Sequence, residues 1–192
     1  MRKTKNIKVK VAKKPKICIG DHFIYNAIEW ICLDIIDGNY LAITAKIWKE
    51  IAFDVDNWNN WEKSSLRRVL NVEFLDKFDK NYLVMQTSDL TADNGDRRYG
   101  TCKDYITLLS CDQYRKYRDL VPYYPEWMWT LTPWNCYNGN DSDNCSGHSV
   151  RDVHPDGFIV SCGARIDVGV APVILISSQP QQLNQLWKDN CR

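Results

Sequence analysis

The chain has 192 residues and a mass of 22.4 kDa, enough for one domain with a hydrophobic core. Hydrophobic residues make up 44% and charged residues 26%, as is typical of a globular protein, and no apolar run approaches the roughly 18 residues of a membrane-spanning helix. The net charge is +1, but residues 1–16 contain eight positive residues and no acidic one, so the rest of the chain carries −7.

Residues 1–16 are therefore expected to form a basic flexible tail. The alternative is an arm that binds nucleic acid or an acidic partner, and this segment is the only hint of nucleic-acid binding in the chain. It has no apolar core of the kind that a secretory signal peptide needs, so export is not expected. We place the folded domain at residues 17–178 and a C-terminal tail, either a short helix or disordered, at residues 179–192.

The eight cysteines would allow a disulfide framework, because their number is even. The chain is nevertheless large for a disulfide scaffold and lacks an export signal. We expect the cysteines to be free thiols.

The first half of the domain predicts a β-hairpin followed by a helix. Residues 24–36 and 40–44 are apolar runs on either side of the turn signal Asp37-Gly38-Asn39. Apolar residues then recur at helical spacing from Trp61 to Phe78. Residues 82–85 are typical of a short strand, and residues 89–100 of a polar loop.

The second half predicts another short helix and a long strand. Residues 105–109 are a buried apolar segment, and Ser110 with Gln113 forms a capping box, so a helix is expected at about 111–118. Residues 168–176 are typical of one strand, in which Pro172 indicates an edge position or a bulge. Between these elements lies an aromatic cluster, expected to anchor loops in the core rather than to form an exposed stacking platform: Tyr123, Tyr124, Trp127, Trp129 and Trp134.

The composition of residues 135–178 is unusual. These 44 residues contain no Lys, Glu, Gln, Met or Trp, although those types make up 37 of the 192 residues. At that frequency such a gap has odds of roughly one in ten thousand. No codon that ends in a pyrimidine encodes any of the five missing types. The segment therefore has the composition of a diversified stretch rather than of one fitted to a single ligand.

The order of several short motifs resembles one protein family. After the hairpin come Trp61, Ser64-Ser65-Leu66-Arg67 and Leu70-Asn71, followed by Tyr99-Gly100-Thr101, Trp127-Met128-Trp129-Thr130 and finally Gly169-Val170-Ala171-Pro172. This series is similar to the C-type-lectin-fold domains of gut bacteria and their phages, some of which are variable proteins of diversity-generating retroelements. The family often has Arg-Ser-Pro where this chain has Leu131-Thr132-Pro133, and Arg where it has Ala171.

The resemblance implies an α+β, C-type lectin-like fold, with two helices packed on short antiparallel sheets and loops anchored by aromatic residues. In that family an error-prone reverse transcriptase converts Asn codons into any of fifteen amino acids, which exclude the five types missing here. The variable region would span about residues 135–168, and its exposed side chains would bind the ligand. The expected variable, ligand-binding residues are Tyr137, Asn138, Asn140, Asp141, Asp143, Asn144, His148, His154, Asp156, Phe158, Val160, Ser161, Cys162, Gly163, Arg165, Ile166 and Val168.

The expected function is accordingly a non-enzymatic recognition module for a protein or cell-surface ligand, without a cofactor, in the cytoplasm or on a phage particle. Tyr137, His154, Phe158 and Arg165 are its expected anchors. The first alternative is a structural or adhesin domain of a phage or bacterium that is not diversified. The second is a relative of the formylglycine-generating oxidases, which have a related fold, with Cys162 as a redox-active thiol.

Two sets of residues contain side chains of the types that bind metal ions. Cys136, Cys145, His148, His154 and Cys162 include zinc-ligand types, but their spacing lacks a Cys-x-x-Cys pair. Asp141, Asp143 and Asn144 resemble part of a calcium loop that lacks its Gly and its closing Glu. Neither metal is expected.

Overall fold

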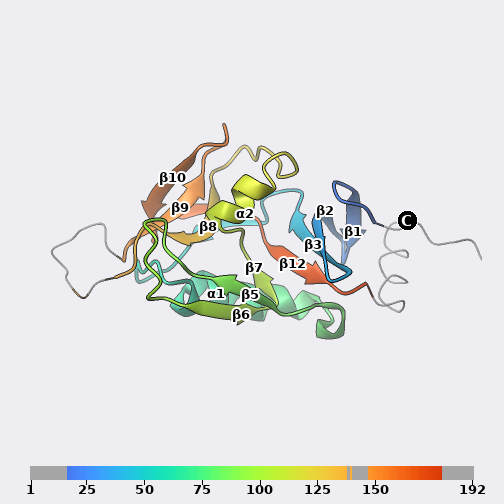
Figure 1. The fold of residues 1–192 in the computed structure, drawn as a ribbon, viewed down its shortest axis with the longest axis horizontal. Helices are drawn as coiled ribbons and strands as arrows, with labels where there is room; N and C mark the ends of the chain where they lie inside the picture. The colour runs from blue at the N-terminus through green and yellow to red at the C-terminus, as the bar shows by residue number, and fades with distance from the viewer. Residues whose placement is uncertain (1–16, 138, 140–146, 179–192) are drawn as a thin grey trace, which may run out of the picture.

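Two five-stranded sheets, a two-stranded ribbon and a few short helices make up the fold in the computed structural model, which describes residues 17–137, 139 and 147–178 (Figure 1). The predicted α+β class, with mostly antiparallel sheets, is confirmed. No helix in the described part of the chain is long and apolar enough to cross a membrane. The strands in this part are β1 His22–Tyr25, β2 Ile28–Ile36, β3 Asn39–Thr44, β4 Lys49–Ala52, β5 Gln86–Asp89, β6 Thr101–Asp104, β7 Ile106–Thr107, β8 Met128–Pro133, β9 Ser149–Val153, β10 Ile159–Gly163, β11 Asp167–Val170 and β12 Val173–Ile176.

The first sheet has the strand order β1-β2-β3-β12-β7 and contains the predicted hairpin. β2 and β3 are joined at Asp37-Gly38, whose φ angles of 50° and 79° fit the turn that suits twisted antiparallel strands. The predicted strand 24–36 is interrupted, because Asn26 and Ala27 also have positive φ angles, 54° and 58°. They form a second tight turn, which separates β1 from β2.

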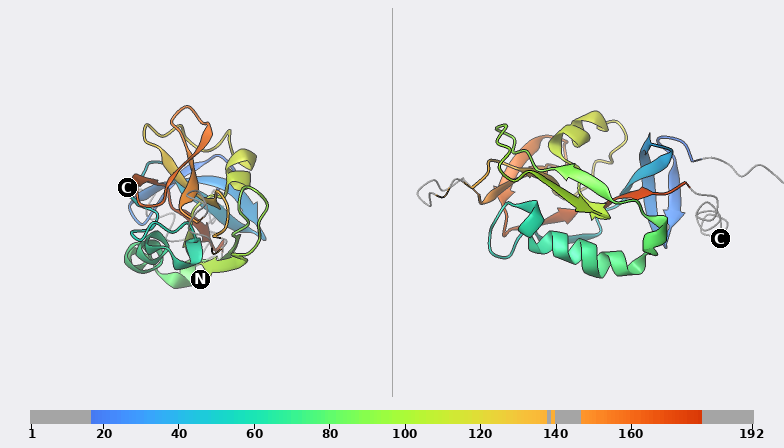
Figure 2. Two further views of the ribbon diagram at one scale, coloured as in Figure 1. Left: turned by 90° about the vertical axis from the view of Figure 1, so that its left-hand side faces the viewer. Right: turned by 60° about the horizontal axis from the view of Figure 1, so that its bottom comes forward.

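The predicted helix after Trp61 is a 3₁₀ turn and, after the extended residue Ser64, a continuous helical segment of changing pitch along one side of the molecule (Figure 2). The backbone N–H of Leu75 donates to the carbonyl of Leu70, five residues earlier, which widens the middle of the segment. Its buried residues Trp61, Leu66 and Phe74 keep one apolar side against the core. The parts are a 3₁₀ turn Trp61–Lys63, α1 Ser65–Val69, a π turn Leu70–Phe74 and a 3₁₀ turn Leu75–Lys77.

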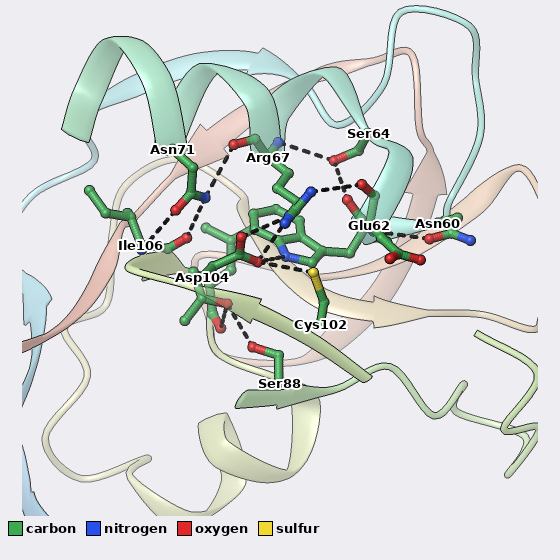
Figure 3. A network of polar contacts seen from close by, with 12 residues as sticks. Asn60, Glu62, Ser64, Arg67, Asn71, Ser88, Cys102, Asp104 and Ile106 are labelled. Carbon is green, nitrogen blue, oxygen red and sulfur yellow. Dashed lines mark hydrogen bonds and ion pairs between the residues drawn. The ribbon is translucent and has the colours of Figure 1, made fainter. Parts of the chain in front are cut away.

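A buried polar network fastens this helical segment to β6 (Figure 3). The carboxylate of Asp104, only 3% exposed, accepts hydrogen bonds from Trp61 Nε1 at 2.9 Å and from Arg67 Nε at 2.8 Å. The side chain of Asn71 accepts from the backbone N–H of Ile106 and donates to its carbonyl, as a neighbouring strand would. The segment is thus held by directional bonds as well as by apolar packing.

The second sheet has the order β10-β9-β8-β11-β4 and lies toward the opposite end of the molecule from β1 and β2 (Figure 1). The prediction of one strand at 168–176 was wrong. The chain bends at Ala171-Pro172, so that β11 lies between β8 and β4 while β12 lies between β3 and β7 in the other sheet. Pro172, which cannot donate a ladder hydrogen bond, stands at this crossing and not on a sheet edge.

The second predicted helix is confirmed, whereas the short strand and the aromatic cluster differ in part from the prediction. The second helix, α2, spans Cys111–Lys116, and its predicted capping box is present. The strand expected at 82–85 is displaced: residues Lys80–Tyr82 form a 3₁₀ turn and the strand is β5, four residues later. In the aromatic cluster, Tyr124 and Trp129 are buried as expected. Three members are exposed, which contradicts the expected core role for them: Tyr123, Trp127 and Trp134.

Candidate ligand-binding surface

The predicted variable residues concentrate on the β9–β10 hairpin at one end of the molecule (Figure 1). β10 pairs with β9 in a regular register, Ile159 opposite Val153 and Gly163 opposite Ser149. The other side of β10 is a sheet edge within the described residues. One long side of the hairpin is therefore open to a ligand.

The turn of this hairpin is held in place from the α2 side. Gly157 has a φ of +91°, and a Cβ atom there would lie 2.5 Å from Nη2 of Arg118. The Arg118 guanidinium lies over the ring of Tyr123, 3.8 Å from its centroid, while the Tyr114 hydroxyl donates to the Gly157 carbonyl at 3.2 Å. This packing fixes the tip that presents Phe158, whose side chain is 70% exposed.

The exposure of the predicted residues varies. Those that are exposed are Asp156, Phe158, Ser161, Arg165 and Ile166. Those that are partly buried are Tyr137, His148, His154, Val160, Cys162 and Gly163. Val168 is a correction: it is 5% exposed and packs in the core, because it alternates on β11 with Asp167 and Gly169. The residues that lie outside the described part of the chain are Asn138, Asn140, Asp141, Asp143 and Asn144.

A loop far away in sequence brings three of these residues together. The ring of Trp58 lies 5.0 Å from that of Tyr137 and 4.9 Å from that of His148. Asn57, with a φ of 64°, accepts a hydrogen bond from the backbone N–H of Arg165 through its side-chain oxygen, and its carbonyl lies 2.7 Å from His148 Nδ1. The loop thus supports both ends of the predicted variable region.

A shallow groove of about 440 Å³ lies beside this surface. Its lining combines residues outside the compositionally unusual stretch, Glu50, Glu126 and Trp127, with residues inside it, Cys162, Ile166, Asp167, Val168 and Gly169. The side chain of Trp127 is 41% exposed.

The position of Trp127 is fixed on two sides. Gly169 donates its backbone N–H to the Trp127 carbonyl at 2.8 Å, and a Cβ atom at 169 would lie 2.5 Å from that oxygen. The ring of His154 contacts the Trp127 ring edge-on, at 5.2 Å between centroids. The indole is thus held at the groove by contacts with β11 and with the end of β9.

A buried carboxylate lies on the same face of the sheet as Cys162. Asp152 is fully buried, and neither of its oxygens has a hydrogen-bond partner in another described residue. The register places it between Trp129 of β8 and Val160 of β10, and alternation along β10 puts Cys162 on that face too. Trp127, just before β8, contacts the ring of His154, two residues after Asp152. Burial raises the pKa of Asp152 to about 6.

The structure shows the state of most cysteines and the positions of several residues of metal-ligand type. Six cysteines lie in the described residues and are free thiols, as expected: Cys18, Cys32, Cys102, Cys111, Cys136 and Cys162. Burial and the charge of Asp152 raise the pKa of the Cys162 thiol, which disfavours the reactive thiolate. No group of three or more His, Cys, Asp or Glu residues in the described ranges is placed to hold a metal ion. Cys145, like Asp141, Asp143 and Asn144, lies outside those ranges.

Sequence reasoning missed two surface residues beside the predicted set. Trp58 was not among the expected surface residues and Trp127 was expected in the core, whereas their side chains are 38% and 41% exposed. The unusual composition that marked residues 135–178 could not identify them, because both lie outside that stretch.

Comparisons of the chain with protein-family models, with curated proteins and with solved structures found no match.

Proposed function

We propose that this chain is a non-enzymatic recognition module with a C-type lectin-like fold, whose exposed residues on and around β10 are diversified by a retroelement and bind a protein or cell-surface ligand. The observation that carries the proposal is an agreement between composition and exposure. Of the twelve expected variable residues that the structure describes, all except Val168 are at least partly exposed. A surface can vary freely only if its side chains do not hold the core together.

The family resemblance also implies residues that stay constant, and seven of these ten are buried: Val150, Arg151, Val153, Gly157, Ile159, Ala164, Gly169, Val170, Ala171 and Pro172, of which Arg151, Gly157 and Ile159 are partly exposed. Val150, Ala164 and Val170 are fully buried in one core cluster, and Ala171 is buried in the other. Ala164 also closes the end of the hairpin, since its backbone N–H donates to the His148 carbonyl at 2.8 Å. The positions expected to stay constant are thus mostly buried and the variable ones mostly exposed, which lets the surface change without loss of the fold.

The direct test is to sequence the DNA around the gene and to sequence the gene deeply in a population of its host. We expect a reverse-transcriptase gene nearby and an imperfect repeat of the DNA that encodes residues 135–172, with adenines at the variable codons. Substitutions should fall on positions such as 158, 161, 165 and 166 and spare Val150, Ala164 and Gly169. Absence of the repeat, or substitutions spread equally over exposed and buried positions, would contradict the diversification proposal.

A second test measures tolerance without knowledge of the ligand. One library would randomise positions 158, 161, 165 and 166 on the displayed protein, and a matched library would randomise the buried positions 150, 164, 168 and 170. Most members of the first library should resist protease, whereas few of the second should, because core substitutions typically cost several kcal/mol, about 2–5 for large-to-small changes. Equal resistance of the two libraries would remove the structural basis of the proposal.

A further inference from the structure

The groove beside β10 has a charge that favours one kind of ligand group. Three of its lining residues are carboxylates, Glu50, Glu126 and Asp167, and no lining residue is basic. None of the three forms an ion pair with a basic side chain among the described residues. Their negative charge is therefore available to a group that enters the groove.

An exposed indole completes this chemistry. Trp127 lines the groove, and its backbone and ring are held by Gly169 and His154 as described above. The face of Trp is the best aromatic partner for a cation, and a ring already held in place loses little freedom when a ligand binds. The apolar side chain of Ile166 lies in the same groove and suits the alkyl part of a long basic side chain.

A further observation at this place is the unpaired carboxylate of Asp152. It is fully buried and lies on the sheet face that carries Cys162, a groove-lining residue. A buried charged group without a partner is costly in a structure, and a cation nearby would offset that cost. Asp152 does not line the groove, but its charge is close enough to raise the pKa of Cys162, which does.

We propose that the groove binds a lysine or arginine side chain of a protein ligand, placed against Trp127 and between the carboxylates of Glu126 and Asp167. This inference rests on the proposed recognition function and specifies its ligand chemistry. Glu50, Glu126 and Trp127 form a constant set that recognises the cation, whereas Cys162 and Ile166 belong to the variable set and adjust the fit to its surroundings. The stretch 135–178 contains no lysine, so none of its residues places an ammonium group in the groove.

The test is a titration of the full chain with n-butylguanidinium, followed by ¹H–¹⁵N NMR, with the neutral isostere N-butylurea as the control ligand. We expect saturable shifts of the Trp127 indole N–H and of the Cys162 and Ile166 amides with the cation only. Asp167→Asn and Trp127→Leu should each weaken binding about twofold to fivefold. The matched control Asp119→Asn removes another exposed charge outside the groove and should leave the affinity unchanged.

Three outcomes would overturn the proposal. Equal shifts with butylguanidinium and butylurea would show that charge is not recognised. An equal loss of affinity in Asp167→Asn and Asp119→Asn would indicate general attraction to an acidic protein. A movement of the Trp127 indole signal in a Lys13→Gln, Lys14→Gln, Lys16→Gln variant, without any added cation, would mean that the chain's own basic segment is the occupant.

The outcome is separable from that of the proposed function. If the gene varies in its host but butylguanidinium does not bind, only the ligand chemistry is wrong. If the cation binds in the groove but neither an imperfect repeat nor variation is found, the groove remains a cation site and diversification is wrong.

Discussion

The Asp152→Asn substitution should stabilise the protein, although it alters a fully buried residue. The carboxylate of Asp152 is 0% exposed and has no hydrogen-bond partner in another described residue, so its ionisation opposes folding. Asparagine has nearly the same shape and carries no charge. The neighbours that influence this carboxylate electrostatically are Arg151 and His154 on the same segment and Cys162 on β10.

The magnitude follows from the pKa. Burial raises the pKa of Asp152 from 3.8 to about 6, and a difference of about two units at 1.36 kcal/mol per unit corresponds to about 3 kcal/mol. Between about pH 4 and about pH 6 the folded protein binds more protons at this site than the unfolded chain does, so this contribution to the free energy of unfolding falls as the pH rises. Below that range Asp152 is protonated in both states and the penalty disappears.

Urea unfolding of both proteins, at intervals from about pH 3 to about pH 8, measures this effect. The advantage of Asp152→Asn should be near zero at the acid end and should grow to about 3 kcal/mol above about pH 7. The difference between the two proteins isolates Asp152, because all other carboxylates are common to both. A variant less stable than the wild type at neutral pH, or an advantage independent of pH, would refute the reasoning. The same substitution should also weaken butylguanidinium binding, so that stability and binding change in opposite directions.

Three further predictions concern the surface, the core and a helix end, and all are measured by urea unfolding. Phe158→Ala should change the free energy of unfolding by less than about 0.5 kcal/mol, because the ring is 70% exposed, whereas Val168→Ala should cost about 2 kcal/mol; a reversed order would contradict the assignment of the two faces. Gly169→Ala should cost about 1–3 kcal/mol, since its new Cβ would meet the Trp127 carbonyl at 2.5 Å, and an unchanged stability would mean that this approach relaxes freely. Ser110→Ala should cost about 1 kcal/mol through the lost cap of α2, and Ser110→Thr, which keeps the hydroxyl, should cost less.

Local signals in the sequence predicted local structure well. Asp37-Gly38 identified a hairpin turn because two adjacent residues with positive φ suit this type of turn, and Asp and Gly accept such angles readily. Ser110 and Gln113 identified the start of α2 because a capping box requires only four neighbouring residues. In both cases the residues that define the feature lie within one turn of the chain.

Features that depend on distant contacts were not predictable. Ala27 has a φ of 58°, an angle that alanine rarely adopts, so the single turn-forming residue Asn26 beside it was too weak a signal for this break between β1 and β2. The apolar run 168–176 looks like one strand, since its two halves are equally apolar. Only the pairing of β11 with β4 and of β12 with β3 reveals that they belong to different sheets.

The candidate surface was predicted in part for a similar reason. The missing residue types marked a continuous stretch, and the resemblance separated most of its exposed positions from its buried ones, with Val168 as the error. The contribution of Trp58 and Trp127 arises from folding: Asn57, next to Trp58, meets the backbone of Arg165 across 108 residues of sequence. No periodic pattern in a single sequence predicts such a contact between distant residues.

The crossing at Ala171-Pro172 has a consequence for how the molecule opens. β11 and β12 are consecutive in the chain, and each is an inner strand of a different sheet. Detachment of one of these strands from its sheet would therefore disturb the other sheet as well. Amide hydrogens of both strands should therefore exchange with solvent in one cooperative event, at the free energy of global unfolding. β10, by contrast, is an outer strand that pairs only with β9 among the described strands, so its amide hydrogens can exchange by local opening while the interior exchanges slowly.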